Sequence, residues 1–254
     1  MIGFAIPWTI SRRFLKPILS IRNTIRQLGR GELEARIQVH AGKELEALAN
    51  ELNGMMEHRK QEKERLLGLN RTLSAICACR HAMIHEIDEK QLNQKICQVL
   101  VEIGAYRMAW IGYLEDDAHG TVTLAAIAGY QTGFQTGGLN AFSESWAENT
   151  NSPAARAIRN RHTAIINDIF ADSQFSPLKA EATRHEYASI IALPLSANRQ
   201  ILGAITLYAE KPDAFGTEEV RLMTELAEDL AYGINAIRNS GQSKPITRRY
   251  PEET

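Results

Sequence analysis

The chain has 254 residues, of which 44% are hydrophobic and 23% are charged, and its formal net charge is -1. This composition is ordinary for a folded protein of roughly two domains and excludes a disordered chain. Acidic and basic residues are nearly balanced, so there is no basic excess and we expect no nucleic-acid partner.

The chain begins with an apolar run over residues 1–10, followed at once by Arg12, Arg13 and Lys16. A membrane-spanning helix needs about 20 apolar residues, and positive residues beside it mark the cytoplasmic side. We therefore expect residues 1–10 to be the C-terminal end of a transmembrane helix that emerges into the cytoplasm. The alternative is a short apolar segment that packs on the protein itself.

Two helices follow in which apolar residues recur at alternating steps of three and four. Pro17 suits the first turn of the first helix, because its missing N–H has no helical partner there. The second stripe starts at Leu45 and keeps its spacing to Ile76, so residues 57–76 are expected to form a coiled-coil signalling helix. A lone helix cannot bury so narrow a stripe, and we therefore expect a parallel homodimer.

This arrangement resembles a HAMP linker domain over residues 11–60. Glu44 matches an acidic position of that family, and Asn53-Gly54-Met55 stands where the family has Asn-x-Met, whereas Lys43 and Glu46 replace the usual Asp and Gly. The resemblance implies a four-helix bundle in a homodimer that passes a membrane signal to a cytoplasmic output; a generic coiled coil is the alternative. The residues assigned to this relay are Pro17, Glu44, Leu45, Leu48, Leu52 and Met55.

The rest of the chain alternates between helical and strand patterns. The helical pattern continues to about Val101 with a break near Asp88, and residues 129–151 are expected to be a long loop. Two turn signals stand out: Ser152-Pro153 can begin a short helix, and Asn198-Arg199 can form a tight hairpin. The expected strands are 108–114, 121–128, 163–167, 189–196 and 200–210, the expected later helices are 176–185 and 217–238, and residues 239–254 are expected to be a flexible tail.

Residues 70–238 resemble a GAF domain, which makes the expected fold class α+β: an N-terminal helical coiled coil, then an antiparallel sheet with flanking helices. The family implies helices on one side of the sheet and a loop-covered ligand pocket on the other. One departure is Ser152-Pro153-Ala154-Ala155, where relatives usually carry Gly-Pro-x-Gly. The stretches that carry the resemblance are Ala105–Gly112, Ile166–Ile169, Asp172–Phe175, Tyr187–Leu195 and Leu202–Tyr208.

The resemblance also implies a candidate pocket for an unidentified small molecule, although the domain could instead bind nothing and act as a dimer spacer. No cysteine lies in residues 129–185, so a covalently attached bilin is not expected, and the cyclic-nucleotide signature is missing; the cofactor stays unknown. The candidate pocket residues are Trp110, Trp146, Asn167, Asp168, Tyr187, Ser189 and Leu193.

No catalytic set and no metal site emerge from the sequence. Three cysteines are too few for a zinc site and point to a reducing compartment, and Gly137-Gly138 lacks the residues that complete a diguanylate cyclase signature. We therefore expect a non-catalytic segment of a bacterial membrane receptor on the cytoplasmic side of the inner membrane. Its output would be a kinase or cyclase domain, in the same protein or in trans. The alternatives are the front part of a sensor histidine kinase or of a diguanylate cyclase or phosphodiesterase, and a soluble ligand-binding module.

Overall fold

The computed structural model describes residues 16–29, 36–38, 42–115, 121–129, 152–171 and 179–242. These residues fall into two compact units, residues 1–69 and residues 70–254, and each unit is described by itself. Several expectations lie outside the described residues: the apolar run 1–10, the loop 130–151 with Trp146, the helix start at Ser176-Pro177 and the tail beyond residue 242. Among the described helices, none is long and apolar enough to cross a membrane.

The first unit pairs two helices across a short connector. Helix α2 spans Lys16–Gly29, and α3 spans Lys43–His85 and begins with two acidic residues in its first turn, where the helix dipole favours them. A small core forms from Ile21 of α2, Ile37 of the connector, and Ala49 and Met56 of α3. The second predicted stripe is thus part of one continuous helix of 43 residues.

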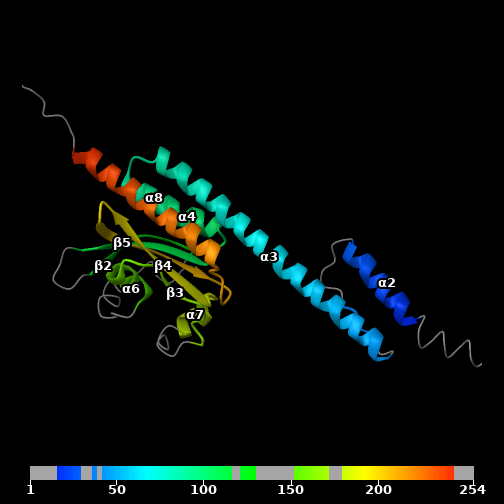
Figure 1. Cartoon of the computed structure of the whole chain (residues 1–254). Helices are drawn as coiled ribbons and strands as arrows, with labels where there is room; N and C mark the ends of the chain where they lie inside the picture. Colours follow the sequence, from blue (N-terminus) through cyan, green and yellow to red (C-terminus); the bar gives the residue numbers. More distant parts are fainter. Residues whose placement is uncertain are drawn as a thin grey trace, which may run out of the picture. The chain divides into compact units, whose positions relative to one another are not determined.

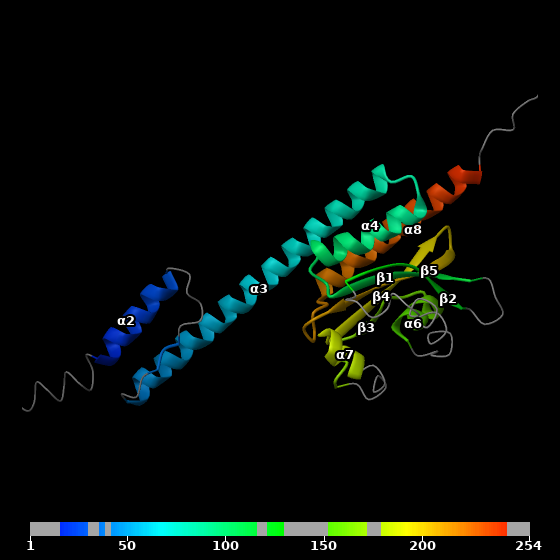
Figure 2. The same cartoon turned by 180° about the vertical axis from the view of Figure 1, so that it is seen from behind.

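The second unit is built on a five-stranded antiparallel sheet with the strand order β2-β1-β5-β4-β3. Figures 1 and 2 show α4 and α8 along one face of this sheet and α6 and α7 on the other. The strands are β1 (Met108–Leu114), β2 (Val122–Ala128), β3 (Ala164–Ile166), β4 (Ser189–Ala197) and β5 (Gln200–Ala209), and the helices are α4 (Glu89–Glu102), α6 (Pro153–Asn160), α7 (Lys179–His185) and α8 (Thr217–Gln242). This architecture confirms the predicted α+β class.

The sheet separates two apolar cores, because successive side chains of a strand point to opposite faces. The first core packs the sheet against α3, α4 and α8, and includes Leu193 and Ile205. The second core packs the opposite face against α6 and α7, and includes Trp110, Ala192 and Tyr208. Strand β4 contributes side chains to both cores, so its sequence contains a continuous run of apolar residues.

Local signals placed several element ends correctly. Asp88 caps α4 by accepting a hydrogen bond from the Gln91 amide at 2.8 Å, which explains the break predicted there. Ser152 caps α6 in the same way, and Pro153 occupies its first turn. Asn198 and Arg199 both have positive φ, as the tight hairpin between β4 and β5 requires.

The last helix differs from its prediction. Helix α8 continues to Gln242, four residues beyond the expected end at Arg238, so residues 239–242 do not belong to a tail. The polar residues there do not stop the helix, and at Ser240 the hydroxyl bonds within it by donating to the carbonyl of Ala236 at 2.8 Å. Polarity alone is therefore a weak helix-stop signal.

Candidate functional site

The second core brings together two of the predicted pocket residues. Trp110 on β1 and Tyr187, just before β4, are both buried in it. Tyr187 meets the ring of Tyr208 edge-on, with 4.8 Å between the ring centroids. Tyr208 was not among the predicted pocket residues. It lies two residues after Thr206 on β5, so the side chains of these two residues point to the same face of the sheet. An aromatic cluster therefore covers one end of this sheet face.

Asn167 and Asp168 form the turn that follows β3. One carboxylate oxygen of Asp168 accepts hydrogen bonds from the amides of Phe170 and Ala171, at 2.8 and 3.3 Å. The Asn167 side chain is exposed, while its carbonyl accepts a bond from the Asp213 amide at 2.8 Å. These groups are engaged in shaping the turn, which carries Ile169 into the second core.

The other predicted pocket residues have different placements. Ser189 is fully buried, and its hydroxyl donates to the carbonyl of Lys211 at 2.7 Å, so its hydrogen-bonding capacity serves the loop after β5. Leu193 lies in the first core, on the face of the sheet opposite Trp110. Trp146 lies outside the described residues. The structure therefore groups Trp110 with Tyr187 and separates Leu193 from them.

One polar residue of this face was missed at the sequence level. Thr206, on the central strand β5, pairs in register with Trp110 on β1 and with Ala192 on β4. It is fully buried, and its Oγ1 has no hydrogen-bond partner among the residues that the structure describes. The sequence signal that could have identified this residue is a hydroxyl side chain in the middle of an apolar strand.

The three cysteines lie away from this face. Cys79 on α3 and Cys97 on α4 are buried in the first core, whereas Cys77 is exposed. Burial raises the pKa of Cys79 to about 12 and raises that of Cys97 further above its ordinary value. Because the thiolate is the reactive form, both buried thiols are inert core residues near neutral pH.

The predicted relay residues divide between the two sides of α3 in the first unit. Leu45 and Leu52 pack against the small core, whereas Leu48 and Met55 are 43% and 66% exposed. Glu44 is exposed in the first turn of α3, and the Pro17 side chain is not among those described. Ile18 and Ile25 of α2 are also about half exposed, at 50% and 49%. Half of the apolar stripe is therefore uncovered in a single chain.

Asn53 anchors the connector of the first unit. Its side-chain amide donates to the carbonyl of Ile37 and accepts from the amide of the same residue, both at 2.9 Å. These two bonds have the same pattern as the pair of backbone hydrogen bonds between two residues on neighbouring strands. Nearby, Arg36 and Glu57 form an ion pair at 2.5 Å. The asparagine of the predicted Asn-x-Met motif thus has a clear structural role.

In the second unit, α3 and α8 run side by side in the same direction (Figures 1 and 2). Thr72 bonds to Glu219, Arg80 pairs with Asp229 at 2.9 Å, and Met83 lies against Gly233. Residue numbers rise together along both helices in these contacts. The helix that enters this unit is therefore held in a fixed register with the helix that leaves it.

A third polar contact holds the end of α8. Arg238 donates two hydrogen bonds to Glu89 of α4, at 2.6 and 2.8 Å, and its guanidinium lies 4.5 Å from the ring centre of Tyr113. The bonds from Arg238 hold the pKa of Glu89 below its ordinary value. The Tyr113 hydroxyl accepts a bond from Asn93 at 2.6 Å, and burial raises the pKa of Tyr113. This cluster joins α4, β1 and α8.

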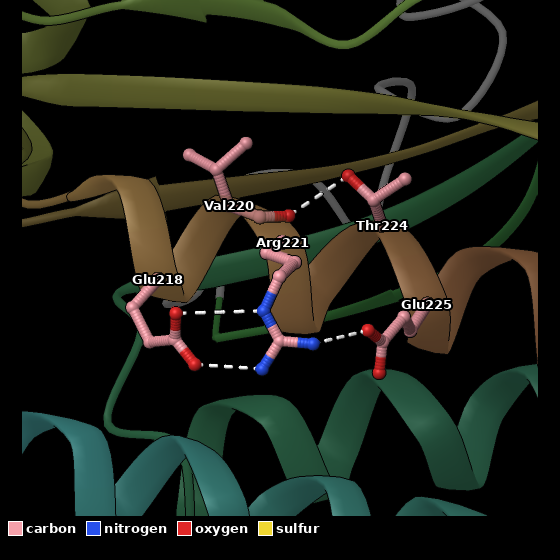
Figure 3. Close-up of polar contacts among 5 residues, drawn as sticks. All are labelled: Glu218, Val220, Arg221, Thr224 and Glu225. Atoms are coloured by element: carbon pink, nitrogen blue, oxygen red, sulfur yellow. Dashed lines mark hydrogen bonds and ion pairs between the residues drawn. The ribbon is translucent and has the colours of Figure 1, made fainter.

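The start of α8 carries a different kind of charge cluster (Figure 3). Arg221 bonds to Glu218, one turn before it, at 2.6 Å and also pairs with Glu225, one turn after it. All three are exposed, and the bonds from Glu218 raise the pKa of Arg221. The Thr224 hydroxyl donates to the Val220 carbonyl at 2.8 Å. These contacts stay within α8, so they support the helix without tying it to its neighbours.

Two family models match the chain. The HAMP domain model matches residues 9–58, and the GAF domain model matches residues 86–235, more than half of the 254 residues. Both resemblances predicted from the sequence, and their order, are thereby confirmed. No curated protein matches the chain.

Solved structures with the fold of the second unit come from several bacteria. The GAF domain of a phosphoenolpyruvate-protein phosphotransferase from Coxiella burnetii is 16% identical, covers 68% of this chain and 97% of its own, and has a TM-score of 0.53. The free methionine-R-sulfoxide reductase of Neisseria meningitidis, solved with its substrate, is 16% identical to this chain. The match covers 66% of this chain and 91% of the reductase, with a TM-score of 0.52. The GAF domain of the corresponding Acinetobacter phosphotransferase is 11% identical to this chain. The match covers 67% of this chain and 97% of that domain, with a TM-score of 0.50. Identities this low establish the fold alone.

Proposed function

Starting from a chain that belongs to the GAF domain family and carries a HAMP domain ahead of its GAF domain, we propose that this protein is the non-catalytic relay of a bacterial membrane receptor. Both domains are regulatory, they generally form dimers, and they pass signals to output domains. In this proposal a stimulus at the inner membrane enters the HAMP domain on the cytoplasmic side. It then travels along α3 to the GAF domain and leaves along α8 to a kinase or cyclase domain.

The observation that carries the proposal is the half-covered apolar stripe of the HAMP domain. Leu45 and Leu52 pack within one chain, while Leu48 and Met55 on the same stripe face outward. A second copy of the chain would cover them, because identical parallel helices align identical positions of the stripe. A bundle of this kind has two alternative packings of similar energy, which is a physical route for coupling distant sites.

The GAF domain supplies the second input in this proposal. An unidentified small molecule would bind on the face of the sheet that carries Trp110 and Tyr187, and would shift the equilibrium only by binding one packing better than the other. The register contacts between α3 and α8 would then transmit the change. The inert, buried thiols of Cys79 and Cys97 favour this regulatory role over thiol chemistry.

Disulfide crosslinking in native membranes tests the relay. In a Cys77→Ser background, the variants Leu48→Cys and Met55→Cys should crosslink between subunits under mild oxidation, because both face the proposed partner. Asn50→Cys is the matched control, since Asn50 is also exposed but lies on roughly the opposite side of the same helix. Equal crosslinking at all three positions, or none at the first two, would contradict the parallel HAMP dimer. Recovery of the chain without membranes would contradict its proposed location.

A further inference from the structure

The buried hydroxyl of Thr206 is a feature of the second core's sheet face that the packing of the described residues does not explain. Thr206 is fully buried on the central strand of the sheet, yet its Oγ1 has no hydrogen-bond partner in the described part of the chain. Leaving a buried polar group unpaired is unfavourable, so such groups in native proteins ordinarily find a partner. By contrast, the hydroxyl of Ser189, equally buried one strand away, is paired with the Lys211 carbonyl at 2.7 Å.

Aromatic rings flank this hydroxyl on the same face of the sheet. Trp110 is its direct cross-strand partner on β1, which places the two Cβ atoms about 4.5–5.5 Å apart. Tyr208 follows two residues later on the same strand and therefore points to the same side. A molecule that reached Thr206 would contact both rings, and aromatic rings favour offset-stacked or edge-to-face contact with one another.

The helix that covers this face packs through small side chains. Ala154 and Ala157 of α6 are buried against the sheet, and Ala192 and Ala204 lie on the sheet beside Thr206. Six of the thirteen buried residues of this core are alanines. Apart from the partly buried Ile158, the residues of α6 that pack on this core therefore have small side chains.

No charged side chain is buried among the residues that the structure describes. All buried members of the second core, and the partly buried Val122, Leu124, Ile127 and Ile158 that pack against it, are apolar or aromatic. Burying an ion among such groups without a partner is strongly unfavourable, whereas a neutral group that satisfies the hydroxyl is accepted. The hydroxyl can donate or accept, so either a ring N–H or a ring nitrogen would suit it.

We propose that Thr206 is the hydrogen-bonding anchor of a site for a small, neutral, planar heteroaromatic molecule. Its ring would pack on Trp110 and Tyr208, and one ring or amide atom would pair with the Thr206 hydroxyl. This inference rests on the proposed function, because it names the class of ligand that the GAF domain would sense.

The test measures binding of two matched pairs of probes to the full chain in detergent by isothermal titration calorimetry. Indole and nicotinamide are the neutral members, and indole-3-carboxylate and nicotinate carry the same rings with a negative charge. At least one neutral probe should bind at least tenfold more tightly than its charged counterpart. Thr206→Val should weaken that binding about three- to tenfold, because it keeps the shape but removes the hydroxyl.

Two further variants separate the hydroxyl from general damage. Thr206→Ser retains the hydroxyl and should bind within about threefold of the wild type, a margin well below the loss expected for a whole hydrogen bond. Thr123→Val alters a threonine on β2, whose hydroxyl donates to Glu115 at 2.6 Å, and should bind like the wild type. Unchanged binding in Thr206→Val, or equal binding of charged and neutral probes, would overturn the inference.

These outcomes are distinct from failure of the relay. If charged probes bind and Trp110→Leu abolishes their binding while Thr206→Val does not, the sensing face stands and the Thr206 anchor is wrong. If no probe of either kind binds, the inference is wrong, while crosslinking at Met55 still reports on the relay independently.

Discussion

The hydroxyl of Tyr106 donates a hydrogen bond of 2.5 Å to Oε1 of Glu219, and the same oxygen accepts a second bond of 3.0 Å from Thr72. Tyr106 precedes β1, Glu219 lies in the first turn of α8, and Thr72 lies on α3. A single carboxylate oxygen thus joins the helix that enters the GAF domain, the helix that leaves it and the approach to a central strand. Any movement of α3 along α8 must break this junction.

Removing the Tyr106 hydroxyl should weaken the junction. We expect Tyr106→Phe to lower the free energy of unfolding by about 1–2 kcal/mol, because a hydrogen bond to a charged group is lost from a mostly buried site. Urea unfolding followed by circular dichroism measures the change. Tyr232→Phe is the control, since Tyr232 lies on α8 but is 70% exposed and should change little. A loss of equal size in both variants would argue against the junction.

The same residue predicts a pH dependence. Burial, followed by the nearby charge of Glu219, raises the pKa of Tyr106 well above its ordinary value. Tyrosine in the unfolded chain loses its proton near pH 10, at about its ordinary pKa, whereas the folded protein retains it. Stability should therefore fall as the pH rises above about 10, because the unfolded state binds fewer protons there. Tyr106→Phe should show a shallower fall, and an identical slope in both proteins would contradict this assignment.

Glu89 predicts the opposite dependence in acid. The bonds from Arg238 lower the pKa of Glu89, so the stability from this pair is present above the ordinary glutamate pKa and is lost as the pH falls through the lowered value. Arg238→Gln should remove about 1 kcal/mol at neutral pH, a modest figure because solvent screens the partly exposed pair. Denaturant unfolding at neutral pH and in acid should show the two proteins converging as the pH falls. A difference that is independent of pH would be incompatible with this pair.

Two buried hydroxyls of the sheet offer a matched comparison. Ser189→Ala should destabilise the protein by about 1–2 kcal/mol, because it leaves the carbonyl of Lys211 without its donor at 2.7 Å. Thr206→Val should be neutral or stabilising by up to about 1 kcal/mol, because none of the described residues pairs with the hydroxyl it removes. Thermal unfolding of the chain without ligand measures both. Clear destabilisation by Thr206→Val would show that the hydroxyl is already paired.

Asn53 should control the connector of the HAMP domain. Asn53→Ala removes both bonds to Ile37, and we expect amide exchange at Ile37 to accelerate about tenfold, which corresponds to about 1.4 kcal/mol of local opening. Hydrogen–deuterium exchange of the peptide that contains residues 36–38 measures this. Asn50→Ala provides the control, because Asn50 is exposed on the same helix and has no such role. Unchanged exchange in Asn53→Ala would show that other contacts hold the connector.

The sequence alone was sufficient wherever the signal was local or periodic. The three-four spacing from Leu45 to Ile76 predicted a helix that the structure contains within α3, and the predicted cap residue Ser152 located the start of α6. The Asn198-Arg199 pair between two strand patterns predicted a tight hairpin, and both residues have the positive φ that such a turn requires. These features depend on neighbours a few residues apart, so the sequence contains the information that decides them.

The face that a residue occupies was decided only by the tertiary structure. Strand β4 is apolar at every position from Ile190 to Leu195, because both of its faces are buried, so alternation could not show that Leu193 lies opposite Trp110. The junction of Tyr106, Glu219 and Thr72 joins residues up to 147 positions apart. The unpaired state of the Thr206 hydroxyl is likewise a property of everything packed around it. Periodicity determined the elements, and long-range packing determined which side chains meet.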